Sequence, residues 1–239
     1  SRPYIDLTLK LMKDFGAEAF WSGSNELTVA PVPYQSRSYY IESDWSAASY
    51  WYEICALAEH KAEIELPGLF ADSMQGDRKV AELFSRLGVD TEYAGNKVLL
   101  KKKGSPVERL DYDFVNQPDL AQTFVVTCVL LGVHFRFTGL QSLKIKETDR
   151  ISALIAEMRK LGYVLSEAEG SVLSWDGERC RPDELPVIST YEDHRMAMAF
   201  APAALRMKEI RIHHPQVVSK SYPQYWEHLK AAGFRIDVE

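Results

Sequence analysis

The sequence lacks several features that would each indicate a particular class of protein. No apolar run approaches the roughly 20 residues that span a bilayer. No basic-then-apolar leader is present, so we expect neither a membrane partner nor export. Cysteine is scarce: Cys55, Cys128 and Cys180 are far apart and odd in number. That usage favours reduced thiols in the cytoplasm over a disulfide framework or a metal site.

Cofactor fingerprints and an excess of positive charge are also missing. The chain has neither the Gly-rich dinucleotide fingerprint nor a phosphate-binding Gly-Lys-Ser/Thr loop, and its six histidines show no metal-ligand spacing. Its 28 basic and 34 acidic residues give a net charge of −6. We therefore expect no nucleotide cofactor, no metal and no nucleic-acid partner, although a local basic pocket for a small anion is still allowed.

The 239 residues, 46% of them hydrophobic, are enough for one or two buried cores, and the chain repeats itself. Four helix-like stretches end in glycine: Gly16, Gly88, Gly162 and Gly233, which are 72, 74 and 71 residues apart. Each glycine lies just past a helix, where it adopts the left-handed conformation at little cost. The apolar residues of these helices recur on one side, so we expect them to cover a sheet.

A second kind of helix lies between these and begins at an aspartate each time. The aspartates are Asp44, Asp119 and Asp193, which are 75 and 74 residues apart. The segments that follow them are apolar on almost every face, which is typical of interior helices. A strand is also expected after Gly233. The other expected strands are 62–66, 91–95, 97–103, 134–140, 164–169, 171–176 and 209–214.

These patterns predict an α/β fold with a repeated unit of about 73 residues: interior helix, strand, covering helix, strand, strand. Three units would occupy residues 44–115, 116–188 and 189–239 and form one lobe, the last unit without its final strand. Residues 1–43 would be the tail of a further, truncated unit. This favours a C-terminal piece of a longer protein, and a short N-terminal helix peculiar to this protein is the alternative.

Charged residues gather at the expected helix starts. In the KETDR motif at 146–150, Lys146 and Glu147 precede Arg150 by four and three residues, so the three can share one side of a first turn. An exposed ion pair on a surface helix is the alternative for a single such match. The other charged helix starts contain Asp119, Asp193-His194-Arg195 and Ser219-Lys220.

If rotation relates the units, these helix starts lie on one rim. Helix dipoles and cations there would hold a polyanion, and the carboxylates would move protons. Taken singly, Asp119 and Asp193 would serve equally well as helix caps, and Lys220 as a solvated lysine.

Five motifs, in order along the whole chain, resemble the 5-enolpyruvylshikimate-3-phosphate synthase family. They are SRPYIDLTL at 1–9, SMQGD at 73–77, KETDR at 146–150, YEDHRMAM at 191–198 and SKSYPQYW at 219–226. The resemblance implies two lobes, each an inside-out α/β barrel of three βαβαββ repeats with parallel helices inside and substrates bound between the lobes. This chain would be one complete lobe and a partial repeat of the other.

The resemblance also implies a transferase reaction of the shikimate pathway. The enolpyruvyl (carboxyvinyl) group of phosphoenolpyruvate passes to the 5-hydroxyl of shikimate-3-phosphate, with release of phosphate. Asp119 would accept the hydroxyl proton and Glu147 would protonate the enol carbon, with assistance from Lys220. Ser142 stands where the family often has asparagine, and SMQGD is assigned no chemistry. Arg150, Arg195 and Lys220 would bind phosphoenolpyruvate; Ser1, Tyr4, Asp119, Ser142 and Lys146 would bind shikimate-3-phosphate; His194 would support them.

The family's first lobe contains an N-terminal Lys-Ser pair and a Ser-Ser-Gln segment. This sequence has neither of the two. We therefore expect that the missing N-terminal lobe is the partner of this chain, and that the chain alone is inactive or nearly so. We also expect the protein to be a cytoplasmic monomer. A UDP-N-acetylglucosamine enolpyruvyl transferase, which shares the fold and the donor, is an alternative. A non-catalytic repeat scaffold is another, but it would scatter its charges over the units.

Overall fold

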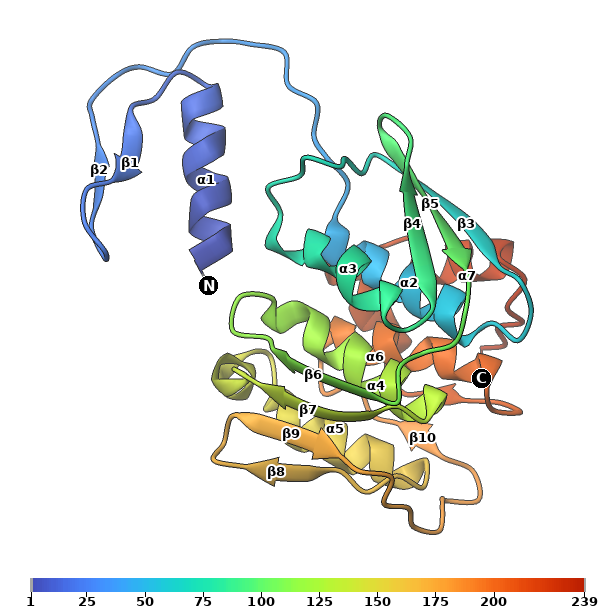
Figure 1. The fold of residues 1–239 in the computed structure, drawn as a ribbon. Coiled ribbons are helices and arrows are strands. Elements are labelled where there is room, and N and C mark those ends of the chain that lie inside the picture. The colour runs from blue at the N-terminus through green and yellow to red at the C-terminus, as the bar shows by residue number, and fades with distance from the viewer. Residues whose placement is uncertain (1, 239) are drawn as a thin grey trace.

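The computed structural model describes residues 2–238, which form a small N-terminal unit and a larger α/β body (Figure 1). The N-terminal unit contains helix α1 (Arg2–Asp14) and an antiparallel pair of strands, β1 (Ala19–Trp21) and β2 (Leu27–Val29). Leu9 is the only buried residue of α1. An extended segment without helix or strand, residues 30–44, leads from this unit to the body.

Three sheets supply the strands of the body. The first has the antiparallel order β3-β5-β4, the second has the order β6-β7-β9-β8, and in the third β10 pairs in parallel with β11. The strands are β3 (Glu63–Pro67), β4 (Val89–Tyr93), β5 (Lys97–Lys102), β6 (Arg109–Asp113), β7 (His134–Thr138), β8 (Ser166–Ala168), β9 (Val172–Trp175), β10 (Val187–Ile188) and β11 (Arg211–Ile212).

Three almost completely buried helices lie in the middle of the body, as the apolar segments predict (Figure 1). They are α2 (Trp45–Leu57), α4 (Ala121–Leu131) and α6 (His194–Phe200), and α4 packs against both of the others. A hydrogen bond of 3.1 Å between the Ser49 and Thr123 hydroxyls joins the N-terminal halves of α2 and α4. The N-terminal parts of these two helices therefore lie together.

Three further helices follow the expected covering positions: α3 (Val80–Ser85), α5 (Arg150–Lys160) and α7 (Tyr225–Ala231). The glycine prediction is confirmed, because Gly16, Gly88, Gly162 and Gly233 all have φ between +86° and +99°. At Gly88 a side chain would also lack space, since an added Cβ would lie 3.0 Å from the carbonyl oxygen of Gly104.

Two strands of the body were not predicted from the sequence. β6 and β10 precede the interior helices α4 and α6, and each pairs in parallel with the strand after that helix. The interior helix is therefore the crossover of a βαβ unit, the connection that parallel strands require. The order β6-α4-β7-α5-β8-β9 is a complete βαβαββ set. Two aspartates in β6 and the two-residue length of β10 concealed these strands.

The strand expected after Gly233 was wrong, because residues 234–238 form neither helix nor strand. No neighbouring strand lies beside this segment within residues 2–238, and an isolated strand has nothing to pair with.

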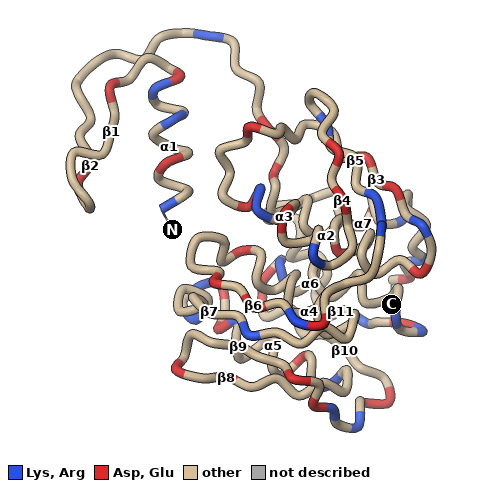
Figure 2. The backbone as a smooth tube through the Cα atoms, in the orientation of Figure 1, with Lys and Arg blue, Asp and Glu red and all other residues tan. Residues whose placement is uncertain are grey.

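Other features of residues 2–238 bear on function. No helix in this range has the length and apolar character needed to cross a bilayer, and no group of three His, Cys, Asp or Glu side chains there could hold a metal ion. The three cysteines are unpaired thiols. Basic and acidic positions are interspersed along the backbone in Figure 2.

Candidate active site

The KETDR motif does not begin its helix where the sequence predicts. Asp149 is the N-cap of α5 and accepts a hydrogen bond of 3.1 Å from the backbone N–H of Ser152, so the helix starts at Arg150. Lys146 and Glu147 therefore lie before the helix and not in its first turn. Because Lys146 and Glu147 precede the helix, their side chains can contact different neighbours.

Arg150 is the centre of an ion network although it is only 1% exposed. Its Nε donates to Asp193 Oδ2 at 2.6 Å, its Nη2 to Glu147 Oε2 at 2.8 Å and its Nη1 to Asp119 Oδ1 at 3.1 Å. The starts of α4, α5 and α6 thus meet at one guanidinium group. A charge buried this deeply is tolerated only with such partners.

Asp119 lies in a short 3-10 turn, Pro118–Leu120, that leads into α4. Its Oδ2 accepts a hydrogen bond of 2.9 Å from the Tyr4 hydroxyl and pairs with Arg195 Nη2 at 3.1 Å. Its Oδ1 faces Arg150 and, at 3.8 Å, Lys146 Nζ. Burial raises the pKa of Asp119, but Arg195, Lys146 and Arg150 outweigh burial and hold it below its usual value. Asp119 is therefore ionised at neutral pH.

The three aspartates at the interior helix starts have different roles. Asp44 caps α2 by accepting from Ser46 N–H at 2.8 Å, and Asp193 caps α6 by accepting from Arg195 N–H at 2.8 Å. Asp119 caps nothing, and its carboxylate faces the cations instead. The simple capping interpretation thus holds for Asp193 and fails for Asp119.

Glu147 lies on the other side of Arg150. Its Oε1 is 3.8 Å from Lys220 Nζ and 3.8 Å from His194 Nδ1. Partial burial raises the pKa of Glu147, but a backbone hydrogen bond, Arg150, His194 and Lys220 together lower it below its usual value. Burial and the adjacent Arg195 lower the pKa of His194, so its ring is neutral at pH 7.

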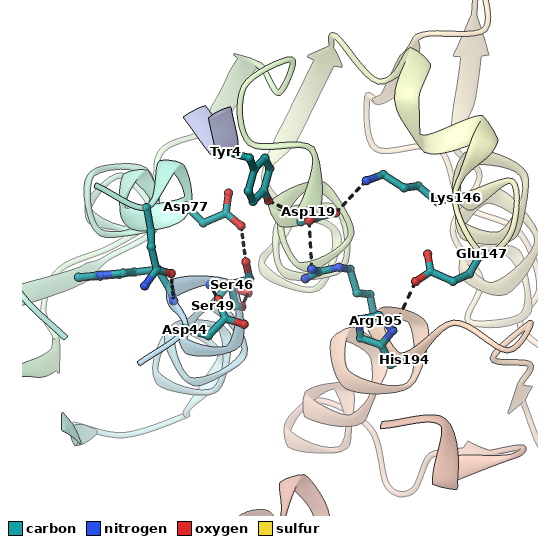
Figure 3. A network of polar contacts seen from close by, with 12 residues as sticks. Tyr4, Asp44, Ser46, Ser49, Asp77, Asp119, Lys146, Glu147, His194 and Arg195 are labelled. Atoms are coloured by element: carbon teal, nitrogen blue, oxygen red, sulfur yellow. Dashed lines mark hydrogen bonds and ion pairs between the residues drawn. The ribbon is translucent and has the colours of Figure 1, made fainter. Parts of the chain in front are cut away.

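The structure thus brings most of the predicted site residues into one ion network (Figure 3). Its members are Tyr4, Asp119, Lys146, Glu147, Arg150, His194, Arg195 and Lys220, joined by the contacts above. Ser142 lies in the 3-10 turn Gln141–Ile145 and is half-buried; no hydrogen bond within residues 2–238 joins it to the network. Ser1 lies outside the described residues.

The SMQGD motif was expected to carry no chemistry, but its last residue lies beside the ion network. Asp77 is 3% exposed, accepts a hydrogen bond from Ser46 Oγ and acts electrostatically on Asp119 and Arg195. The repeat offered a signal, because Asp77 precedes Arg150 by 73 residues, which is one unit. Its burial against α2, which gives it this importance, could not be read from the motif.

This arrangement suits a multiply charged anion. Four cations face a region where the interior helix α4 and the covering helix α5 begin, and free backbone N–H groups at helix starts favour negative charge. Arg150 and Arg195 present planar guanidinium groups that can grip carboxylate or phosphate in bidentate fashion. Asp119 and Glu147 lie beside these groups as ionised carboxylates that can accept protons.

Solved structures of similar fold define the class. An EPSP synthase from Acinetobacter baumannii superposes with a TM-score of 0.75 at 21% identity, covering 100% of this chain and 56% of that one. The enolpyruvyl transferase NikO from Streptomyces tendae superposes with a TM-score of 0.60 at 18% identity, covering 97% of this chain and 53% of that one. The protein therefore has an α/β fold of the enolpyruvyl transferase class.

Sequence comparison is more specific. The chain belongs to the EPSP synthase (3-phosphoshikimate 1-carboxyvinyltransferase) family, whose model matches residues 1–229. A 3-phosphoshikimate 1-carboxyvinyltransferase from Bacteroides fragilis is 64% identical over 238 residues, which are 100% of this chain and 58% of that protein. The enzyme of that name from Vibrio campbellii is 33% identical over 234 residues, 97% of this chain and 53% of that protein. The chain therefore spans little more than half the length of these relatives.

Proposed function

We propose that the protein containing this chain transfers the enolpyruvyl group of phosphoenolpyruvate to the 5-hydroxyl of shikimate-3-phosphate and releases phosphate. The family and the 64% identical relative support this activity. The observation that carries the proposal is the meeting of Arg150 and Arg195 with the carboxylates Asp119 and Glu147 at adjoining helix starts.

Binding is assigned first to the cations. Arg150, Arg195 and Lys220 hold the phosphate and carboxylate of phosphoenolpyruvate, and Lys146 and Tyr4 contact shikimate-3-phosphate. Each of these cations now pairs with Asp119 or Glu147, so an arriving substrate anion replaces a carboxylate as the partner of the guanidinium groups. Ser1 and Ser142 are assigned to the site on the motif alone, and His194, whose Nδ1 is 3.8 Å from Glu147 Oε1, is assigned a supporting role. No metal and no cofactor is required in this scheme.

Proton transfer is assigned to the two carboxylates. The 5-hydroxyl oxygen attacks C2 of the enol and its proton passes to Asp119, while C3 receives a proton from Glu147 with help from Lys220. The tetrahedral intermediate then loses phosphate, which carries away the proton held by Asp119, and Glu147 takes a proton back from C3 as the enol double bond re-forms. Cations hold the pKa of Glu147 low in the free site. Substrate anions that neutralise these cations raise that pKa and so favour the protonated, proton-donating form.

At the scale of the fold, we propose that residues 44–239 form one inside-out barrel of three βαβαββ repeats, over about 44–115, 116–188 and 189–239. Residues 1–43 then belong to the last repeat of a second lobe. The complete set from β6 to β9 supports the repeat. The second lobe supplies the rest of the substrate clamp and is the partner of this chain. We further propose a cytoplasmic monomer, which the unpaired cysteines support.

A phosphate-release assay on the full-length protein with both substrates tests the activity. We expect turnover that requires both substrates and that falls about 100-fold or more in Asp119→Asn, because a positioned base contributes that much. The control Asp237→Asn changes an exposed carboxylate that pairs with Arg235, and it should leave turnover unchanged. No phosphate release, or release with phosphoenolpyruvate alone, would refute the proposal.

UDP-N-acetylglucosamine in place of shikimate-3-phosphate tests the alternative enolpyruvyl transferase. We expect no turnover with it. A non-catalytic scaffold is disfavoured because the charges converge on one network, and turnover with either acceptor would exclude it.

A further inference from the structure

Asp77 lies beside the ion network without a role in the proposed mechanism. It belongs to the 3-10 turn Gly76–Lys79, which leads into the covering helix α3 much as Arg150 opens α5. Its Oδ2 accepts the hydrogen bond from Ser46, but its buried Oδ1 has no hydrogen-bond partner within residues 2–238. An unsatisfied buried acceptor costs about 1–3 kcal/mol, so a partner that binds at another stage is expected.

Tyr4 is a neutral donor beside Asp77, and Arg195, whose buried Nε also has no hydrogen-bond partner within residues 2–238, is a charged one. Burial raises the pKa of the Tyr4 hydroxyl, and the negative charges of Asp77 and Asp119 raise it further. In Figure 3 the Tyr4 ring lies between these two side chains. The hydroxyl has one proton and donates it to Asp119 in this state. The oxygen of Asp77 therefore remains unpaired.

Asp119 has no free position for a substrate hydroxyl in the ligand-free chain, before substrate anions take over its cationic partners. Its Oδ2 is occupied by Tyr4 and Arg195, and its Oδ1 faces Arg150 and Lys146. Tyr4 is the only neutral member of this set and is 42% exposed on α1. Displacing Tyr4 separates no ion pair, so it costs less than displacing a cation.

We propose that Asp77 is a positioning residue: its free oxygen accepts the Tyr4 hydroxyl when a substrate hydroxyl takes the place of Tyr4 on Asp119. The Tyr4–Asp119 hydrogen bond is exchanged for one to Asp77, and the substrate hydroxyl fills the vacated position. No covalent bond changes in this step. The identity of the substrate hydroxyl rests on the proposed function, whereas the exchange itself is a property of the ligand-free chain.

The exchange should depend on pH. Burial raises the pKa of Asp77 to about 6, against the lowering effects of the Ser46 hydrogen bond and of Arg195. Below that pH, Asp77 carries a proton and no longer offers a free anionic acceptor. The titratable and charged groups that face it come from five elements: Tyr4 of α1, Asp44 at the start of α2, Tyr112 of β6, Asp119 before α4 and Arg195 of α6.

Titration of Asp77 by carboxyl ¹³C NMR in the ligand-free chain tests the exchange. Asp119→Leu removes the competing acceptor, so Tyr4 should donate to Asp77 and the pKa of Asp77 should fall by about one unit or more. Adding Tyr4→Phe, which deletes only the hydroxyl, should reverse part of that fall. The control Tyr34→Phe alters a tyrosine that is 63% exposed and should reverse none of it. Asp119→Ala, which also has no acceptor, serves for the same comparison if Asp119→Leu does not fold.

An identical pKa of Asp77 with and without Tyr4→Phe in the Asp119 variant overturns the exchange. In the full-length protein, kcat/KM of the wild type should fall below about pH 6. Asp77→Asn should lower kcat/KM about tenfold and remove this fall below about pH 6 (the acid limb of the pH profile). Asp77→Glu should restore the acid limb. An acid limb unchanged by Asp77→Asn overturns the role in turnover. Absence of wild-type turnover refutes the proposed function, and the titration then still decides the inference.

Discussion

Arg150 connects parts of the chain that are far apart in sequence. It joins Asp119, Glu147 and Asp193, and Asp193 is completely buried. Each carboxylate would be costly to bury alone, and each is acceptable because the guanidinium group is shared. The same residue thus holds the fold together and, in the proposed function, binds the substrate anion.

Removal of Arg150 should therefore destabilise the protein. We expect Arg150→Met to lower the free energy of unfolding by about 3–5 kcal/mol, because it leaves a buried charge without its partner. The control Arg235→Met alters an arginine that is 88% exposed and should change stability by less than about 0.5 kcal/mol. Urea denaturation measures both. Equal effects of the two substitutions would contradict this account of Arg150.

Glu53 is a buried acid outside the site. It lies in the interior helix α2, is 0% exposed, and neither carboxyl oxygen has a hydrogen-bond partner within residues 2–238. Burial raises its pKa well above the usual value of about 4.5, although Thr127 lies near. The folded chain therefore holds a proton on Glu53 that the unfolded chain releases above about pH 4.5. This contribution to stability is complete below that pH and is lost as pH rises toward the folded-state pKa.

Glu53→Gln should remove this loss. The stability difference between Glu53→Gln and wild type should grow in favour of the variant by up to about 1.4 kcal/mol per pH unit above about pH 5. The control Glu184→Gln alters an exposed glutamate and should give a difference that does not change with pH. Urea denaturation at several pH values measures this, and a pH-independent difference for Glu53→Gln would contradict it.

At the scale of helices and strands, the terminal glycines provide a matched comparison. Alanine at Gly88 or Gly233 must adopt φ near +87° or +99°, which costs about 1–2 kcal/mol in either case. At Gly88 the new Cβ would also press on the Gly104 carbonyl at 3.0 Å, whereas at Gly233 it meets nothing within 4 Å. We expect Gly88→Ala to lower the melting temperature more than Gly233→Ala does. Equal losses would show that the close approach is unimportant.

The same elements show which parts of the fold are predictable. Helices apolar on every face, such as α2 and α4, could be predicted as interior because no exposed position would suit them. β6 and β10 could not, because pairing with the strand beyond the crossover helix defines them, and the local sequence does not. The site divides in the same way. The contact between Glu147 and Arg150 could be predicted because the two residues are close in sequence. The contacts of Arg150 with Asp119 and Asp193 could not, because they depend on helix packing.

At the scale of the whole molecule, the N-terminal unit reaches the body's site through Tyr4. That contact places α1 at the edge of the ion network, beside Asp119. The chain spans 58% of its Bacteroides fragilis relative, and under the proposed function the rest of such a protein supplies further substrate contacts. We expect the isolated chain to release phosphate at least about 10³-fold more slowly than the full-length protein, since orientation and electrostatics supply most of the rate. Comparable rates would contradict the proposed two-lobed site.

The most direct measurement is a crystal structure of the full-length protein with shikimate-3-phosphate and an unreactive phosphoenolpyruvate analogue. We predict that the anionic groups of the analogue contact the guanidinium groups of Arg150 and Arg195, and that the 5-hydroxyl lies within hydrogen-bond distance of Asp119. Ligands bound away from these helix starts, with Asp119 still paired to Arg195, would contradict the assignment of this ion network as the active site.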